Sequence, residues 1–176
     1  MTTFLLDVNV LIALIDPAHV QHEHAHKWFA GAGKRSFATC PITENGLLRI
    51  VGHPKYPNSP GPPSDVARLL SAFRALPGHR FWPDKISIAD ESLVQTAQLS
   101  THSRVTDSYL LALARANSGR LASMDARLAV DAVAGGADAL ELIVDWFRER
   151  LRRHGPGESR HGRQHWLLQY CSKFGG

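Results

Sequence analysis

Apolar positions along the chain fall into short runs that alternate with longer segments of helical periodicity. The first run is too short to cross a membrane and predicts a buried strand over residues 3–7 that ends at Asp7. The next apolar run predicts a helix over residues 8–15. The alternation continues to about residue 144 and favours an α/β domain built on a parallel sheet.

The remaining elements follow from the same pattern. Further strands are predicted over residues 36–40, 80–82, 120–124 and 139–144. Helices are predicted over residues 18–32, 65–76, 90–99, 106–117 and 126–133, with Ser64 as the N-cap of the second of these. A further helix is predicted after Pro41, with Thr43 as its N-cap and Leu47, Leu48 and Val51 on its inner face. Residues 52–63 hold five prolines and two glycines and predict a loop.

Charge divides the chain into two parts. Residues 1–144 carry 13 Lys/Arg and 13 Asp/Glu, whereas residues 145–176 carry 7 and 3 and so account for the whole net charge of +4. The hydrophobic content of 44% over 176 residues is enough for one domain with its own core. We therefore expect one folded domain over 1–144 and a basic C-terminal tail over 145–176, solvated and partly disordered, with a charge that favours nucleic acid.

The cysteine content and the N-terminus bear on the compartment. Only Cys40 and Cys171 are present, so we expect no disulfide framework and a reducing compartment. The N-terminus lacks a basic region, and its apolar stretch contains Asp7 and Asp16, which argues against a signal peptide and a transmembrane helix. A cytoplasmic location without membrane partners is expected.

Four acidic residues lie where strands end or helices begin. Asp7 and Asp125 follow predicted strands, while Glu44 and Asp107 open predicted helices. In doubly wound α/β folds these positions share one edge of the sheet, where ligands bind. The four carboxylates would then converge on one crevice and require cations or protons. Taken singly, Glu44 and Asp107 could equally be favourable partners of helix dipoles.

The ligand chemistry of such a crevice indicates its reaction. Hard oxygen ligands without cysteine favour Mg²⁺ or Mn²⁺ over zinc. An ion of this kind beside a phosphodiester indicates metal-assisted hydrolysis, with one carboxylate acting as general base. Asn9 and Ser123 lie two residues from Asp7 and Asp125 and could orient ligands or waters. Arg49 and Arg127 are candidates for contacts with the phosphates of such a substrate.

Four stretches in order, residues 5–12, 40–49, 105–114 and 119–125, carry a family resemblance. Over roughly residues 1–144 the chain closely resembles the PIN-domain ribonucleases, and in particular the VapC toxins of type II toxin–antitoxin pairs. The resemblance implies a three-layer α/β/α sandwich with a short parallel sheet. It does not extend to residues 145–176.

The resemblance also implies an active site and partners. Asp7, Glu44, Asp107 and Asp125 take the family's acidic positions, with Asp7 and Asp107 binding Mg²⁺ or Mn²⁺ and the other two binding it directly or through water. The implied activity is that of an endoribonuclease toxin acting on tRNA, rRNA or mRNA. A homodimer and inhibition by a cognate antitoxin protein are implied as well.

Two other interpretations remain open. A catalytically inactive PIN-like module could bind RNA or a protein with the same acids in structural roles. A zinc hydrolase could be centred on His22 and His26, which share a helix face with Glu23 beside the first of them in an H-E-x-x-H pattern.

Overall fold

Five short parallel strands form a single sheet in the computed structural model, which describes residues 1–143. The strands are β1 (Phe4–Leu6), β2 (Phe37–Thr39), β3 (His79–Phe81), β4 (Arg120–Ser123) and β5 (Leu140–Leu142), in the order β3-β2-β1-β4-β5. The basic tail expected over residues 145–176 lies outside the described residues. The central strand β1 pairs with β2 on one side and with β4 on the other.

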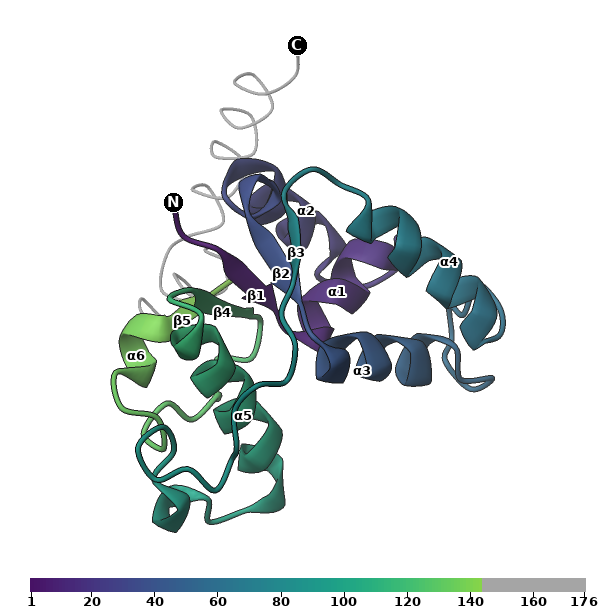
Figure 1. The fold of residues 1–176 in the computed structure, drawn as a ribbon. Coiled ribbons are helices and arrows are strands. Elements are labelled where there is room, and N and C mark those ends of the chain that lie inside the picture. Colours follow the sequence, from purple (N-terminus) through teal and green to yellow (C-terminus); the bar gives the residue numbers. More distant parts are fainter. Residues whose placement is uncertain (144–176) are drawn as a thin grey trace, which may run out of the picture. The chain divides into compact units, whose positions relative to one another are not determined.

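Helices cover both faces of this sheet (Figure 1). They are α1 (Val8–Ile15), α2 (His22–Gly31), α3 (Pro41–Val51), α4 (Pro63–Arg74), α5 (His102–Ala116) and α6 (Gly136–Ala139), with 3₁₀ turns at Gly33–Arg35 and Thr96–Gln98. Helices α1 to α4 pack in one core, and α5 and α6 in the other. This confirms the predicted α/β/α sandwich. No helix within residues 1–143 is both long and apolar enough to cross a membrane.

The strands supply both cores because successive side chains point to opposite faces. Phe4 and Leu6 join the core of α1 to α4, while Leu5 between them joins the core of α5 and α6. In β4, Leu121 and Ala122 divide in the same way. Strands buried on both faces are apolar throughout, which is why β1 reads as a continuous apolar run in the sequence.

Two predicted helices are absent, and both predictions were wrong. Residues 90–99 form turns and one 3₁₀ turn, and residues 126–133 contain turns without a helix. The Asp90 carboxylate accepts bonds from the backbone N–H and the hydroxyl of Ser92, which stabilises a turn in place of a helix. The two segments meet instead, through an antiparallel bridge between Val94 and Val133.

Helix starts also differ from the predictions. The N-cap of α3 is Cys40, whose backbone N–H donates to Thr43 Oγ1 over 3.1 Å, so Thr43 acts from inside the helix. The N-cap of α4 is Pro62, not Ser64. Helix α5 begins at His102, four residues before the predicted start. Asp107 therefore lies beyond the first turn of α5, where the helix dipole no longer accounts for an acid.

Candidate functional site

The carboxyl end of β1 carries the centre of the candidate site. Asp7 directly follows β1 and is the N-cap residue of α1, and its backbone N–H donates to the carbonyl of Ala122 in β4 over 3.0 Å. Asp125 lies just beyond the end of β4. Asp7 and Asp125 thus follow the neighbouring strands β1 and β4, and the strand order reverses between these two strands. Open α/β sheets bind ligands at such a point, outside the carboxyl ends of the strands.

The Asp7 carboxylate is buried and accepts three hydrogen bonds. Oδ1 accepts from the backbone N–H of Val8 over 2.6 Å. Oδ2 accepts from Asn9 Nδ2 over 2.8 Å and from Ser123 Oγ over 2.7 Å. With only 6% of its surface exposed, Asp7 has its orientation fixed by these contacts.

Asn9 and Ser123 join α1 to the loop after β4. The Asn9 amide donates to Ser123 Oγ over 3.2 Å, and its oxygen accepts from the backbone N–H of Met124 over 3.2 Å. Ser123 Oγ also accepts from the backbone N–H of Asp125 over 3.2 Å. The network therefore fixes Asp7 and the start of the Asp125 loop relative to each other.

Three aspartates share one electrostatic environment. Burial raises the pKa of Asp7 above its usual value, the hydrogen bonds from Ser123, Val8 and Asn9 oppose the rise, and the charge of Asp125 adds to it. Burial also raises the pKa of Asp107, and the charges of Asp7 and Asp125 raise it further. Asp7, Asp107 and Asp125 thus lie close enough to repel one another, although they come from three separate parts of the chain.

The Glu44 carboxylate contacts side chains other than these three acids. Its Oε1 accepts from Thr39 Oγ1 over 2.6 Å, and the carboxylate pairs with the Arg74 guanidinium over 3.4 Å. Thr39 Oγ1 also lies 2.8 Å from His79 Nε2. Glu44 therefore faces β2, β3 and α4, and its charge does not contribute to the pKa shifts of Asp7 and Asp107.

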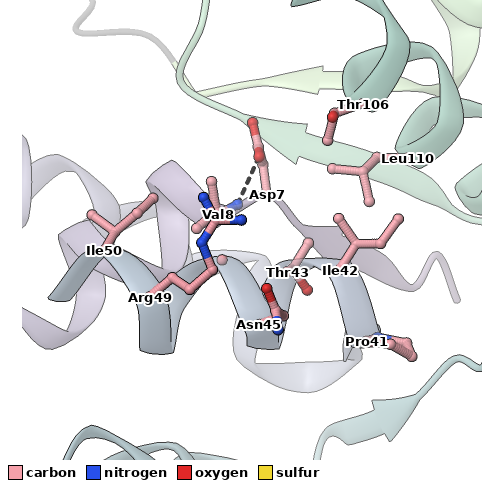
Figure 2. A pocket seen from close by; sticks show the side chains of 11 residues that line it. Asp7, Val8, Pro41, Ile42, Thr43, Asn45, Arg49, Ile50, Thr106 and Leu110 are labelled. Atoms are coloured by element: carbon pink, nitrogen blue, oxygen red, sulfur yellow. Dashed lines mark hydrogen bonds between the residues drawn. The ribbon is translucent and has the colours of Figure 1, made fainter. Parts of the chain in front are cut away.

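A cavity of about 560 Å³ opens beside Asp7 between α3 and α5. Its walls are largely apolar and come from α1, α3 and α5 (Val8, Pro41, Ile42, Thr43, Asn45, Gly46, Arg49, Ile50, Thr106 and Leu110). Figure 2 shows Asp7 between α3 on one side and Thr106 and Leu110 on the other. Helix α3 thus presents Asn45, Gly46 and Arg49 to the cavity, and Glu44 is not among the lining residues.

The two arginines proposed from the sequence differ in their surroundings. Arg49 is exposed, lines the cavity and has no acidic partner within residues 1–143. Arg127 is exposed and pairs with Asp125 over 3.5 Å, and its backbone N–H donates to the same carboxylate oxygen over 2.9 Å. Arg49 is therefore the more available of the two for a phosphate.

The donor set can be compared with the needs of a metal ion. The pKa values of Asp7 and Asp107 are raised, in part by the charge of Asp125. Three such carboxylates, without sulfur or imidazole ligands, suit a hard divalent cation, which would relieve their repulsion. Within residues 1–143, however, no three His, Cys, Asp or Glu side chains are grouped closely enough to hold an ion. Asp7 and Glu44 are instead occupied by hydrogen-bond donors of the chain itself.

His22 and His26 lie on one face of α2, with ring centroids 4.2 Å apart. His22 Nδ1 lies 2.8 Å from the carbonyl oxygen of Ala13, and His26 Nε2 lies 2.9 Å from that of Leu14. These carbonyls belong to the last turn of α1, where backbone acceptors lack helical partners. The pair thus caps α1, and no third ligand from residues 1–143 joins it.

Asn45 and Thr106 are site residues that the sequence did not single out. Both line the cavity beside Asp7. Asn45 is one turn before Arg49 on α3, and Thr106 directly precedes Asp107, so helical spacing from these candidates could have found them.

The chain is similar to a known protein family and to named relatives. Residues 4–134 match the model of the PIN domain family. Two proteins of Mycobacterium tuberculosis are each 43% identical: Ribonuclease VapC44 over 131 residues (74% of this chain, 92% of the relative) and Ribonuclease VapC39 over 138 residues (78% and 99%).

Solved structures agree with the fold. The toxin VapC20 of Mycobacterium tuberculosis superimposes with a TM-score of 0.55 at 12% identity, covering 74% of this chain and 96% of the other. A toxin–antitoxin complex from Klebsiella pneumoniae gives 0.51 at 19% identity, covering 80% and 97%. The chain therefore belongs to the PIN-domain family, in the group that includes these VapC ribonucleases.

Proposed function

We propose that the chain is a metal-dependent endoribonuclease, the toxin of a toxin–antitoxin pair, that hydrolyses RNA phosphodiester bonds. The observation that carries this proposal is the group of three coupled aspartates, Asp7, Asp107 and Asp125, beside an open cavity at the carboxyl end of β1. The ribonuclease names of relatives at 43% identity support the same activity.

Asp7 and Asp107 would hold the metal ion, with Asp125 binding directly or through water. Mg²⁺ or Mn²⁺ fits the all-oxygen donor set, and when bound it supplies an activated water and offsets charge on the phosphate oxygens. Glu44 joins this set only by leaving Thr39 and Arg74. Asn9 and Ser123 hold Asp7 in place, since both donate to its Oδ2.

Asp107 accepts no hydrogen bond within residues 1–143, so its oxygens are available to a metal ion. Burial and the charges of Asp7 and Asp125 raise its pKa, and a bound cation would offset the repulsion between the three carboxylates. One of the carboxylates would act as the general base. The RNA phosphate would enter the cavity beside Asp7, where the Arg49 guanidinium can neutralise a phosphate oxygen.

A protein antitoxin, a homodimer and a cytoplasmic location complete the proposal. Structural neighbours with TM-scores above 0.5 include a toxin–antitoxin complex, which supports a partner protein for this chain as well. The dimer is tested by light scattering on the purified chain: a mass twice that of 19.4 kDa is expected, and a monomer at micromolar concentration would contradict it.

The activity is tested with purified chain and total RNA. Cleavage is expected in Mg²⁺ or Mn²⁺, complete loss in excess EDTA, and recovery when Mn²⁺ exceeds the chelator. Cleavage that persists unchanged in EDTA would contradict the proposed chemistry. Calorimetric titration with Mn²⁺ adds a second readout, because heat of binding that is absent at millimolar metal would favour the inactive binding module.

A further inference from the structure

A second cavity continues from the first along α3. It measures about 410 Å³ and is lined by Arg49, Ile50, His53, Lys55, Tyr56 and Pro57. Arg49 and Ile50 line both cavities, so the two share a wall at the end of α3. The two cavities therefore adjoin at the end of α3, which offers an extended ligand a path from Asp7 to the loop after α3.

The charged side chains that line the second cavity, apart from His53, are both basic. Arg49 and Lys55 are exposed, and neither has an acidic partner within residues 1–143. By contrast, Arg68, Arg74, Arg104, Arg120 and Arg127 are all paired with carboxylates. The second cavity has no carboxylate in its lining, so it attracts an anion.

His53 adds a neutral donor. Its Nδ1 accepts the backbone N–H of Lys55 over 3.0 Å, so the proton of the neutral ring is on Nε2. A ring of this tautomer can donate to a phosphate oxygen without being charged. The partly buried Tyr56 ring lines the same cavity and offers an apolar surface for a ribose or a base.

The loop after α3, which carries His53, Lys55 and Tyr56, is held by hydrogen bonds to Asp16. Asp16, at the C-terminal end of α1, is only 4% exposed and accepts from the Tyr56 hydroxyl over 2.6 Å and from Asn58 Nδ2 over 3.0 Å. Its other oxygen accepts from the backbone N–H of Ala18 over 2.9 Å. Asp16 is thus a positioning residue that fixes the loop beside Arg49.

We propose that this second cavity is a phosphate subsite for the RNA strand, formed by Arg49, His53 and Lys55 and held in place by Asp16. The subsite rests on the proposed function, because it would bind the part of the RNA substrate that extends away from the cleaved bond. It assigns binding of the flanking strand to the end of α3 and to the loop after it. A single strand suits the path because Tyr56 can stack only on an unpaired base.

The test measures binding of a fluorescein-labelled single-stranded RNA in EDTA as salt is raised. Lys55→Ala and Arg49→Ala are each expected to weaken binding about 3- to 10-fold and to reduce the slope of log K against log salt by about 0.7, the value for one phosphate contact on a single strand. Lys34→Ala is the matched control, since Lys34 is exposed and lies before the amino end of β2, whereas α3 follows the carboxyl end of that strand.

Unchanged slopes in both variants would overturn the subsite, and so would equal losses in Lys34→Ala. If RNA binding is unaffected but the variants no longer bind an acidic peptide such as hexaglutamate, the cavity serves a protein ligand and the proposal is wrong. Tyr56→Phe, which removes the bond to Asp16, should raise KM for cleavage and leave kcat unchanged. A loss of kcat alone would contradict the positioning role.

The subsite and the catalytic proposal fail in different ways. RNA binding that depends on Lys55 without any cleavage would refute the nuclease and leave the subsite intact. Cleavage by the parent chain with normal KM in Lys55→Ala and Arg49→Ala would refute the subsite alone.

Discussion

At the scale of single residues, the four acids of the candidate site differ in the groups that their carboxylates contact. The charge of Asp125 raises the pKa of Asp7 and of Asp107, whereas the Glu44 carboxylate contacts Thr39 and Arg74. The sequence placed Glu44 in the first turn of a helix after a strand, which is correct. It could not show which face of α3 points to the cavity, because that depends on how α3 packs against its neighbours.

Replacement of Glu44 tests this distinction. Glu44→Gln is expected to keep cleavage within about 10-fold of the parent chain, since its carboxylate contacts Thr39 and Arg74 and not the other acids. Initial rates on the same RNA, measured at saturating Mn²⁺, give the comparison. A loss of about 100-fold or more in a variant of unchanged Tm would show that Glu44 moves into the site during catalysis.

Asp107→Asn separates function from folding. The folded-state pKa of Asp107 is raised, so its ionised form opposes folding at pH values above that pKa, and this cost disappears as the pH falls towards the ordinary value of 3.8. In EDTA, the variant should therefore have a higher Tm than the parent at pH 7 and the same Tm near pH 4, while cleavage in Mn²⁺ is lost.

Thermal unfolding followed by circular dichroism at both pH values measures the effect. The exposed Asp131, paired only with Arg104 at the surface, provides the control Asp131→Asn, for which little change is expected. A Tm for Asp107→Asn below that of the parent at pH 7 would show that Asp107 is stabilised by contacts outside residues 1–143.

At the scale of elements, local patterns predicted the strands and the helices that pack on them. The apolar runs of β1, β2 and β4 and the helical spacing of α1, α3 and α4 all correspond to observed elements. The predictions failed at residues 90–99 and 126–133, whose conformations depend on turn bonds at Asp90 and on the bridge between Val94 and Val133. A contact between residues so distant in sequence leaves no local periodicity.

The site was predictable to a similar extent. The ends of the predicted strands identified Asp7 and Asp125. The hydrogen bonds of Asn9 and Ser123 connect the segment around Asp7 to the end of β4, close to Asp125. The anchor at Asp16 was not predictable, because its partners Tyr56 and Asn58 lie in a loop without periodicity.

Asp16→Asn tests the anchor of the loop after α3. Burial would raise the pKa of Asp16, but hydrogen bonds from Tyr56, Asn58 and the backbone of Ala18 outweigh it and hold the pKa below its usual value. The carboxylate therefore stabilises the fold above pH 4 and loses this effect as the pH falls through its folded-state pKa. We expect Asp16→Asn to lower the free energy of unfolding by about 1–2 kcal/mol at pH 6, because the hydrogen bonds to a charged acceptor are weakened.

Urea unfolding at pH 6 and at pH 3 measures this loss. The difference in the free energy of unfolding between the variant and the parent should be largest at pH 6 and smaller at pH 3. A difference that is the same at both pH values would mean that the charge of Asp16 plays no part and that shape alone is responsible.

At the scale of the whole molecule, the domain boundary remains a proposal. We propose that residues 1–144 form the complete nuclease domain, since the described unit spans Met1–Ile143 and 138 residues of this chain cover 99% of VapC39. A chain ending at residue 144 should unfold cooperatively and cleave RNA, with a weaker salt dependence because the basic residues 145–176 are gone. Loss of cooperative unfolding would show that the domain needs those residues.

The most direct measurement compares RNA cleavage by the parent chain and by Asp7→Asn at saturating Mn²⁺. Asp7 accepts hydrogen bonds from Val8, Asn9 and Ser123 and interacts electrostatically with both other aspartates, so it is the centre of the proposed site. Cleavage should fall by at least about 100-fold, while circular dichroism shows the fold retained. If Asp7→Asn cleaves RNA as fast as the parent chain, the three aspartates are not the active site.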